Sequence, residues 1–502
     1  DILTFAEFET ATNALASGLA GLGIDRGDRV VGMMYNSKAF LLAMVAVHKR
    51  GAIFVPINTE LKGAFLEHQI RNIEPCAAFV GDELRPAFDT ISIDGLNIEA
   101  TVSIEGNGEP LTGSRAIAFA DLLETQARAE DVVEAEAHDI CMIMFTSGTT
   151  GPSKGTLMPH AHSVLFGFGA GRALKMTPED CMFICMPFFH AMGLMLQLTS
   201  CLVYGSSAHV IRRFSATTWL DEIRASKATL TYGLGVIPEF IFRQPPSPYD
   251  KDHNLRSMVA VPIGEDWGAP FEERFGLRLV QAYGMTECNI PAYGKLEDPV
   301  MAGCAGHIDN DFFEVKIVDA DTDEEMPKGE VGEIVVRPTQ PACFMQGYYN
   351  MPERTIEAWR NLWFHTGDAG RFDEEGRLFF IDRIKDCIRR RGENISAFEV
   401  EQVINNHPEV AESCVIGVRD ADAGGEEEVK ACVVSVGNGV EPTSILDWCV
   451  ERMPRYAVPR YIEYVDALDK TPTGKLQKQG LRDAGITSGT WDREDVGYVV
   501  PR

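Results

Sequence analysis

The chain has 502 residues, which is too long for one compact core and predicts two or three subdomains. Hydrophobic residues make up 45% and charged residues 24% of the chain, as in ordinary soluble globular proteins. The formal net charge of −28 argues against nucleic acid and anionic membranes as the main partners.

Helical and strand patterns alternate through the first part of the chain. We expect an amphipathic helix over 7–22, a strand over 29–35, a helix over 39–50 and a short strand over 52–56. The apolar run 140–145 is typical of a buried strand. Such alternation predicts parallel sheets with helices on both faces.

A different pattern follows in the last third of the chain. Segments 314–318 and 332–337 look like paired strands of a smaller antiparallel subdomain before Asp368. A capping box over 396–399 opens a helix, and the apolar runs 414–418 and 429–436 predict strands. These elements indicate a compact α+β domain of roughly 115 residues.

The sequence also carries signals about compartment and termini. No apolar run reaches the roughly 18 residues that span a bilayer, and no basic-then-apolar signal peptide opens the chain. Twelve cysteines are scattered without a Cys-x-x-Cys pair or a zinc-type cluster, which indicates free thiols in a reducing cytoplasm. Because the sequence begins at Asp1 without methionine, we expect its native start to be missing.

A glycine-rich polar loop directly follows the predicted strand 140–145. Glycines let backbone N–H groups approach phosphate oxygens, hydroxyls donate hydrogen bonds and a lysine adds a positive charge. It does not fit the register of a Walker A loop. Taken alone, the loop is equally compatible with a plain surface turn. The residues concerned are Thr146, Ser147, Gly148, Thr149, Thr150 and Lys154.

Further motifs follow in a fixed order. They read Tyr283-Gly284-Met285-Thr286-Glu287, Trp363-Phe364-His365-Thr366-Gly367-Asp368, Asp382-Arg383-Ile384-Lys385-Asp386 continuing to Gly392-Glu393-Asn394-Ile395, and Pro472-Thr473-Gly474-Lys475. With the glycine-rich loop, this set resembles the adenylate-forming superfamily and, within it, the acyl-CoA ligases. The chain looks most like the carnitine/crotonobetaine and bile-acid CoA ligase branch.

The resemblance implies an α/β fold with two domains. Residues 1–383 would form a large N-terminal domain of stacked, mostly parallel sheets with helices and a small β subdomain. Residues 384–502 would form a small, mobile α+β domain.

The resemblance also implies a two-step reaction. An acid reacts with ATP to give an acyl-adenylate, and the thiol of CoA then displaces AMP, with Mg²⁺ as a further cofactor. The expected partners are a small carboxylic acid or its adenylate and CoA, and a homodimer is compatible with them.

Three other functions compete with this interpretation. An adenylation module of peptide synthesis normally needs a carrier domain, for which the sequence ending at Arg502 leaves no room. A luciferase-like oxygenase needs a specialised pocket that nothing here marks. A non-catalytic nucleotide-binding module is disfavoured because Lys475 and Glu287 are both present.

Several residues are candidates for the nucleotide site. One carboxylate can accept both hydroxyls of a ribose diol, so Asp368 suits that role, although an isolated Asp is more often a cap or turn residue. By resemblance Arg383 also contacts the ribose. Tyr283, beside Gly284, offers a flat face for adenine. Thr286 can reach the α-phosphate, and Glu287 can hold Mg²⁺.

The resemblance gives the C-terminal motifs a part in domain movement. Lys475 would enter the site in one orientation and stabilise charge during adenylation. Lys385 would be the hinge that exchanges this orientation for the thioester-forming one. The predicted CoA-binding residues are Arg389, Arg390, Arg391, Gly392 and Glu393, although a triple arginine is as often simply solvated.

The predicted acyl pocket is mostly small, Met-rich or aromatic, which suits a large hydrophobic acid. Fatty, aromatic, steroid and terpenoid acids all fit it. His190 is a candidate for orienting the carboxylate or gating CoA, against the alternative of a packed core histidine. The predicted walls are His190, Met192, Gly193, Tyr232, Gly233, Gly235, Trp267 and Met285.

One segment departs from the family pattern. Where relatives carry small residues, this chain reads Glu265-Asp266-Trp267. An indole and two carboxylates there would suit a quaternary ammonium group. Alternatively they would crowd the pocket and repel a triphosphate, leaving an enzyme that only thioesterifies a preformed acyl-adenylate.

Overall fold

The computed structural model describes residues 2–106, 108–146, 153–234, 237–384, 387–390, 393–419, 427–437, 439–453, 455–470 and 476–500. The side chains of Cys387, Arg389, Glu393, Asn394, Ser396 and Glu399 lie outside this description. The chain forms two compact units, which we call the first unit (1–314 and 336–364) and the second unit (315–335 and 365–502). The proposed domain boundary between residues 383 and 384 stays a prediction.

The first unit begins with a seven-stranded sheet of order β5-β4-β3-β1-β2-β6-β7. All its neighbouring strands pair in parallel except β6 and β7, which are antiparallel. The strands are β1 (Arg29–Met33), β2 (Ile53–Pro56), β3 (Ala77–Val80), β4 (Ala100–Ser103), β5 (Arg115–Ala118), β6 (Ile140–Thr146) and β7 (Lys154–Pro159).

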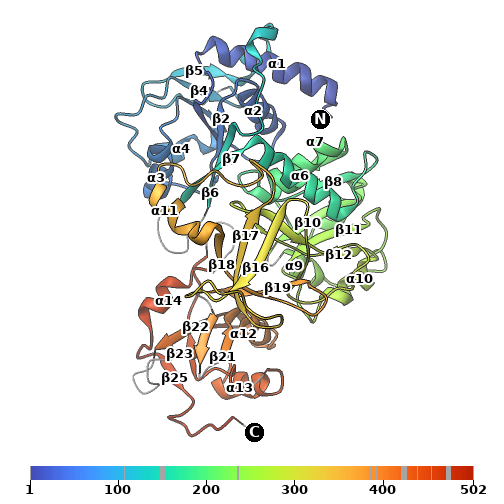
Figure 1. Cartoon of the computed structure of the whole chain (residues 1–502), viewed down its shortest axis with the longest axis vertical. Helices are drawn as coiled ribbons and strands as arrows, with labels where there is room; N and C mark the ends of the chain where they lie inside the picture. The colour runs from blue at the N-terminus through green and yellow to red at the C-terminus, as the bar shows by residue number, and fades with distance from the viewer. Residues whose placement is uncertain are drawn as a thin grey trace. The chain divides into compact units, whose positions relative to one another are not determined.

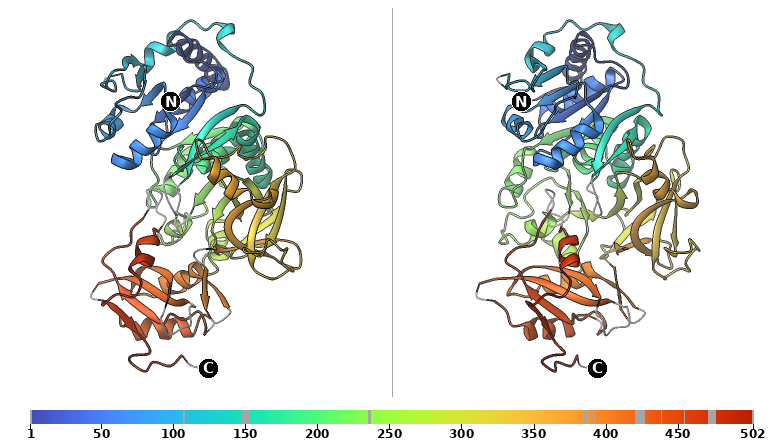
Figure 2. Two further views of the ribbon diagram at one scale, coloured as in Figure 1. Left: turned by 60° about the vertical axis from the view of Figure 1, so that its left-hand side comes forward. Right: turned by 90° about the vertical axis from the view of Figure 1, so that its left-hand side faces the viewer.

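Helices cover both faces of this first sheet (Figures 1 and 2). The helices α1 and α2 pack on one face, and α3 and α4 on the other. Helix α1 begins at a capping box in which Thr4 Oγ1 accepts from Glu7 N and Thr4 N donates to the Glu7 carboxylate. The helical segments are α1 (Phe5–Gly21), α2 (Lys38–Lys49), α3 (Gly63–Ile73), η1 (Asp82–Leu84), α4 (Arg85–Phe88), α5 (Phe119–Leu123) and η2 (Ala129–Asp131).

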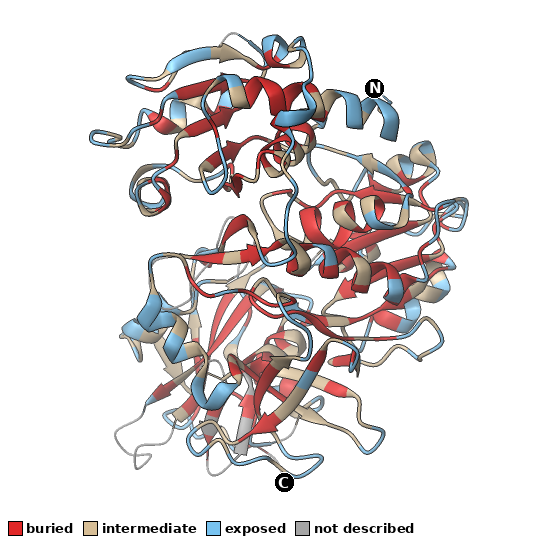
Figure 3. Cartoon of the chain, turned by 45° about the horizontal axis from the view of Figure 1, so that its top comes forward, coloured by how far each residue is buried: buried red, intermediate tan, exposed pale blue. Residues whose placement is uncertain are grey.

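A second sheet of five parallel strands has the order β12-β11-β10-β8-β9. Four of its strands, β8, β10, β11 and β12, are largely buried, as their apolar residues predict, whereas the edge strand β9 is mostly exposed (Figure 3). The five strands are β8 (Cys181–Ile184), β9 (Ser207–Val210), β10 (Leu230–Leu234), β11 (Ser257–Val261) and β12 (Arg278–Val280).

The two sheets share one hydrophobic core, to which helices α2 and α6 both contribute. Helices α8, α9 and α10 pack with β8 and β11 in a separate core. This arrangement confirms the predicted stack of mostly parallel sheets. The helical segments are α6 (His160–Leu174), the π-helix η3 (Met192–Thr199), α7 (Ser200–Tyr204), α8 (Trp219–Ser226), α9 (Ile237–Phe242) and α10 (Gly268–Phe275).

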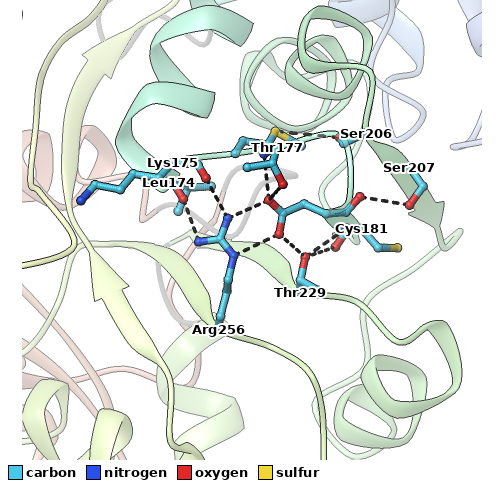
Figure 4. A network of polar contacts seen from close by, with 10 residues as sticks. Leu174, Lys175, Thr177, Cys181, Ser206, Ser207, Thr229 and Arg256 are labelled. Carbon is cyan, nitrogen blue, oxygen red and sulfur yellow. Dashed lines mark hydrogen bonds and ion pairs between the residues drawn. The ribbon is translucent and has the colours of Figure 1, made fainter.

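An ion-pair network supports the amino-terminal edge of the second sheet (Figure 4). The carboxylate of Asp180 accepts from Thr177 N, from Thr229 Oγ1 (2.7 Å) and from two nitrogens of Arg256 (2.8 and 3.0 Å). Arg256 also donates to Leu174 O at the end of α6. The network therefore ties α6 to the starts of β8, β10 and β11, at the edge opposite their carboxyl ends.

Antiparallel strands follow the second sheet. In the first unit, β13 (Ala282–Met285) pairs with β14 (Asn289–Tyr293), which pairs with β15 (Cys304–Ile308). Further along, β16 (Phe313–Val318) neighbours β17 (Gly332–Pro338), as predicted, and β18 (Phe364–Phe372) pairs antiparallel with β19 (Leu378–Arg383). The helical segments α11 (Pro352–Ala358) and η4 (Arg360–Leu362) precede β18.

The second unit ends in an α+β fold. A hairpin of β20 (Cys387–Arg390) and β21 (Glu393–Ser396) leads into α12 (Ala397–Asn405). A four-stranded sheet then follows in the order β22-β23-β24-β25. Helices α12 and α13 pack on one of its cores, which confirms the predicted domain type. The remaining elements are β22 (Val410–Arg419), β23 (Glu427–Ser435), α13 (Pro442–Val450), β24 (Tyr461–Tyr464), α14 (Gln479–Ala484) and β25 (Thr490–Asp492).

Candidate active site

The predicted pocket residues of the first unit follow the carboxyl ends of adjacent parallel strands. Segment 185–194 follows β8, residue 235 follows β10, segment 262–267 follows β11 and segment 281–287 follows β12. In parallel sheets the carboxyl ends lie at one edge, which is where such folds bind ligands. The second sheet therefore gathers segments that are distant in sequence at one candidate site.

The predicted phosphate loop joins β6 to β7. Thr146 and Lys154 are partners across this antiparallel ladder, so the strands hold both ends of the loop. The residues between them, including Ser147, Gly148, Thr149 and Thr150, lie outside the described residues. Lys154 Nζ lies 4.1 Å from the ring centroid of Tyr348, a cation–π contact.

The turn of the Tyr-Gly-Met-Thr-Glu motif joins β13 to β14. A Cβ at Gly284 would lie 2.1 Å from Asn289 O, so this close backbone approach requires glycine. Tyr283 is buried, whereas Met285 and Thr286 are half-buried. Asn289, at φ 68°, takes the left-handed conformation that Asn tolerates best after glycine.

His162 on α6 holds this turn through hydrogen bonds. This role was not predicted from the sequence. His162 Nε2 lies 2.9 Å from Thr286 O, and Asn289 Nδ2 lies 3.2 Å from His162 Nδ1. Burial lowers the pKa of His162 to about 4, so the ring is neutral and one nitrogen alone donates. Nδ1 also lies 3.1 Å from Cys343 O, so the one ring proton serves either Thr286 O or Cys343 O. Nothing local in the sequence links His162 to a residue 124 positions away.

Glu287 lies buried beside this turn and fits the expected Mg²⁺. Tyr348 Oη donates to Glu287 Oε1 at 3.0 Å, and Met345 N donates to Glu287 O. Within the described ranges, no group of three His, Cys, Asp or Glu side chains could hold a metal ion. A lone carboxylate suits Mg²⁺ shared with substrate phosphates rather than an all-protein cage.

His190 is the polar group of the predicted acyl pocket. Its Nε2 is buried without a hydrogen-bond partner among the described residues, and its ring centroid lies 4.5 Å from that of Phe189. Burial lowers the pKa of His190 to about 4, so the imidazole is neutral near pH 7. A neutral ring with an unpaired nitrogen can give or take a hydrogen bond from a ligand.

The neighbours of His190 are shaped by close backbone packing. The π-helix η3 begins at Met192, and a Cβ at Gly193 would lie 2.4 Å from Pro187 O. The helix can therefore approach the preceding segment only with glycine at this position. π-Helical turns occur often at functional sites.

Other residues that we predicted to line the acyl pocket are more deeply buried. Tyr232 is fully buried in the core shared by the two sheets, and burial raises its pKa. Gly233 allows the close approach of Met258 and Pro238. Gly235 lies outside the described residues.

The departing segment is arranged differently from our expectation. Trp267 is buried in the core under α10, with its ring centroid 5.9 Å from that of Phe271. A Cβ at Gly264 would lie 2.5 Å from the indole Nε1, so the ring also packs against this backbone. Glu265 and Asp266 are exposed. A buried indole offers no open face to a quaternary ammonium group, and exposed carboxylates repel a triphosphate weakly.

In the second unit, Asp368 and Arg383 are brought together. They are ladder partners on β18 and β19, and Arg383 Nε lies 2.8 Å from Asp368 Oδ1. Asp368 N donates to Thr366 Oγ1 at 3.1 Å, and Thr366 Oγ1 in turn donates to Ile334 O. The Asp368 carboxylate is buried and the Arg383 side chain is partly exposed.

The CoA-binding prediction changes at Arg390. This side chain is buried in an ion pair with Glu428 (2.6 Å) and donates to Tyr456 O at 2.7 Å. Its guanidinium is therefore engaged within the second unit and we do not retain it as a CoA ligand. Arg391 and Gly392 lie outside the described residues, as do the side chains of Arg389 and Glu393.

The predicted hinge and catalytic lysine also fall outside the described residues, namely Lys385 and Lys475. The flanks of segment 471–475 are paired, since Lys470 and Leu476 form a β-bridge and Gln477 N donates to Asp469 O at 2.9 Å. These contacts hold the two ends of the segment together.

Helix α12 contacts chain segments near the predicted hinge and near the predicted catalytic lysine. The sequence analysis did not predict these contacts. Asp382 Oδ2 accepts from Phe398 N (3.0 Å) at the start of the helix. Glu401, one turn further on, pairs with Lys478 (2.8 Å) and accepts from Val415 N. Lys478 follows Lys475 by three positions in the sequence. The helix thus joins β19, the strand before the predicted hinge, to Lys478, three residues after the predicted catalytic lysine.

Two family models match the chain. The model "AMP-binding enzyme" matches residues 1–349, and "AMP-binding enzyme C-terminal domain" matches residues 399–475. Within the described residues, no helix is both long and apolar enough to cross a membrane.

Individual proteins are similar over nearly the whole length. A crotonobetaine/carnitine–CoA ligase of Salmonella agona is 30% identical over 95% of this chain and 93% of its own. The ATP-bound structure of MatB from Rhodopseudomonas palustris has a TM-score of 0.82 at 26% identity, covering 96% of this chain and 94% of MatB. The anthranilate CoA ligase AuaEII, in complex with anthranoyl-AMP, has a TM-score of 0.84 at 26% identity, covering 96% and 92%. Motifs, fold and relatives agree, and the chain belongs to the AMP-binding enzymes as an AMP-forming acyl-CoA ligase.

Proposed function

We propose that the protein activates a hydrophobic carboxylic acid with ATP and transfers the acyl group to CoA. The observation that carries this proposal is the buried Nε2 of neutral His190, which has no hydrogen-bond partner among the described residues and whose ring packs against apolar Phe189. An apolar pocket with one convergent polar group suits an acid whose carboxylate is its only polar part. The similarity to CoA ligases supports the reaction class.

The first step is adenylation. The acid's carboxylate oxygen attacks the α-phosphorus of ATP, the bond to the β-phosphate oxygen breaks, and pyrophosphate leaves. We assign the phosphates to Thr146, Lys154 and Thr286 with the Ser147–Thr150 loop, adenine to Tyr283 and Gly284, and the ribose to Asp368 with Arg383. Glu287 would hold Mg²⁺, which supplies positive charge to the phosphates when bound.

The second step forms the thioester. The CoA thiol gives its proton to solvent water and its sulfur attacks the acyl carbonyl carbon. The bond from that carbon to the phosphate oxygen breaks, and AMP leaves. In our proposal Lys475 serves the first step, and rotation at Lys385 then brings Arg389, Arg391, Gly392 and Glu393 to CoA. Exchange of orientations explains how one site serves two reactions.

The proposal also covers which class of acid is the substrate. The relative from Salmonella agona is described as acting on crotonobetaine and carnitine, both small betaines. Because the indole of Trp267, which would have suited such a cation, is buried, we favour a hydrophobic acid without a cationic group. Exposure of Glu265 and Asp266 likewise supports full two-step activity over the adenylation-impaired alternative.

A panel assay tests this proposal. The protein is incubated with ATP, Mg²⁺, CoA and one acid at a time, from benzoate-type, medium-chain fatty and steroid acids to carnitine and crotonobetaine. Thioester is detected by mass spectrometry, with synthetic acyl-adenylate plus CoA in parallel. Product from hydrophobic acids and ATP supports the proposal. Product from the betaines alone overturns the acid class, and product from the adenylate alone establishes the impaired alternative.

The cysteines support our proposal of a reducing, cytoplasmic location. All the cysteines whose side chains are described are free thiols, and most are buried. Burial raises the pKa of several of these thiols, such as Cys185 to about 12, which keeps them unreactive.

A further inference from the structure

We propose that Tyr348 is a positioning residue for adenylation, because its hydroxyl holds Glu287 in place and its ring holds Lys154. Tyr348 has no part in thioester formation. This inference rests on the proposed function, in which Glu287 holds Mg²⁺ and Lys154 contacts phosphate.

The hydroxyl of Tyr348 orients the metal-binding carboxylate. Tyr348 Oη donates to Glu287 Oε1 at 3.0 Å, and both side chains are buried. A hydrogen bond to one carboxylate oxygen restricts rotation of the group and leaves the other oxygen directed elsewhere. Such outer partners of a metal ligand commonly change metal affinity by about 10- to 100-fold when removed.

The ring of Tyr348 holds the lysine of the phosphate loop. Lys154 Nζ lies 4.1 Å from the ring centroid, so the ammonium rests on the negative face of the ring. Lys154 is also the first residue of β7, which fixes its backbone. The ring is therefore one of the contacts that restrict this long side chain.

Backbone hydrogen bonds hold the main chain of Tyr348 in place. Tyr348 forms a β-bridge with Thr156, and on either side Leu157 N donates to Gly347 O and Tyr349 N donates to Gly155 O. Tyr348 N also donates to Thr355 Oγ1 at 2.9 Å. The ring and hydroxyl are therefore aimed by β7, the strand that leaves the phosphate loop.

One residue thus connects two motifs that lie 133 positions apart, from Lys154 to Glu287. Both groups act on charges of the triphosphate and its metal, which are present only during adenylation. Once pyrophosphate has left, thioester formation needs neither group. Loss of Tyr348 should therefore separate the two half-reactions.

The test compares Tyr348→Phe, which removes the hydroxyl, with Tyr348→Leu, which also removes the ring. Tyr349→Phe is the matched control, since Tyr349 is the adjacent, partly buried tyrosine that packs with a hydrophobic core. Adenylation is measured as acid-dependent exchange of pyrophosphate into ATP over a Mg²⁺ series. Thioester formation is measured separately from synthetic acyl-adenylate and CoA, and folding is checked by thermal unfolding.

We expect Tyr348→Phe to raise the Mg²⁺ concentration for half-maximal exchange by about tenfold. Tyr348→Leu should additionally raise KM for ATP, while thioester formation from the adenylate stays within about twofold for all variants. An unchanged Mg²⁺ dependence in Tyr348→Phe overturns the proposal. Equal losses in both half-reactions with an unchanged unfolding temperature also overturn it.

Failure of the underlying function is distinguishable from failure of this inference. A wild-type protein without any exchange activity refutes the proposed adenylation. In that case ATP binding is titrated calorimetrically with and without Mg²⁺. A Mg²⁺-dependent gain in ATP affinity that Tyr348→Phe loses and Tyr349→Phe keeps supports the positioning role, and an equal gain in all three proteins refutes it.

Discussion

Asp368 and Arg383 face each other as partners on β18 and β19, and Arg383 Nε lies 2.8 Å from Asp368 Oδ1. The two groups that we assign to the ribose are therefore paired with each other. The arginine orients the carboxylate, and the ladder fixes both backbones. In our proposal this pair, rather than two independent side chains, binds the ribose diol.

We predict that Asp368→Ala and Arg383→Ala each weaken binding of a non-hydrolysable acyl-adenylate analogue. Losing a charge-assisted hydrogen bond should cost about 1.5–3 kcal/mol, roughly 10- to 150-fold in Kd. Because the residues contact each other, the double variant should lose less than the sum, by about 0.5 kcal/mol or more. Calorimetric titration of all four proteins gives these values. Strict additivity would show that the two side chains act separately, and unchanged affinity would refute the ribose assignment.

The hinge at Lys385 gives a second prediction. Proline fixes φ, so Lys385→Pro should block backbone rotation. Pyrophosphate exchange and thioester formation from synthetic adenylate are measured separately, with Lys385→Ala as the control for loss of the side chain. We expect the proline variant to lose one half-reaction by about 100-fold or more and to keep the other, since a change of 2.7 kcal/mol in a barrier is about 100-fold in rate. Parallel losses in a folded protein would place the pivot elsewhere.

Buried neutral histidines predict an acid-sensitive fold. Burial lowers the pKa of His48 to about 3 and the pKa values of His162 and His190 to about 4. Between these values and the unfolded value near 6.5, the unfolded chain binds more protons than the folded one. Stability is therefore fully present above about pH 6.5 and falls as the pH drops toward 4.

Urea unfolding between pH 7.5 and 5 measures this dependence. His162→Gln should lose about 1–2 kcal/mol less than the wild type between pH 6.5 and 5, because one buried histidine no longer titrates. The exposed His138 provides the control variant His138→Gln, which should keep the wild-type slope. Identical slopes in all three proteins would show that His162 takes up no proton on unfolding.

We predict that the Asp180 network contributes to the stability of the fold but not to catalysis. Asp180→Asn keeps the shape of the side chain but removes the charge that faces Arg256, and should destabilise the fold by about 1.5–3 kcal/mol. Because the network lies at the amino-terminal edge of the second sheet, both half-reactions at 25 °C should stay within about twofold. A lower unfolding temperature with intact rates confirms this. Selective loss of adenylation would mean that the edge is coupled to the site.

Much of the fold follows from local sequence patterns. The expected strand over 140–145 and helix over 39–50 appear as β6 and α2 within about a residue of the expected ends. Apolar alternation and capping residues act over a few positions, so they are readable from the sequence. The predicted strands of the C-terminal domain appear as β22 and β23 for the same reason.

The candidate site was less predictable because its contacts are long-range. Tyr348, His162 and Arg390 owe their roles to partners far away in the sequence, and no local pattern marks such pairs. The packing of Trp267 was not predicted either. Its large apolar ring is buried under α10, in the same cluster that Met192 packs against, and its place in the pocket stays a prediction.

The hydrogen bond from Phe398 N to Asp382 spans the proposed pivot, since Lys385 lies between the two residues in the sequence. If the chain rotates at the proposed pivot, we expect this bond to open and close in each turnover. The strength of one amide–carboxylate contact therefore helps to set how long the enzyme waits in this orientation. In this proposal the contact between α12 and Asp382 affects the rate of domain rotation. Asp382 is therefore a position at which that rate can be changed without altering any group that we assign to substrate.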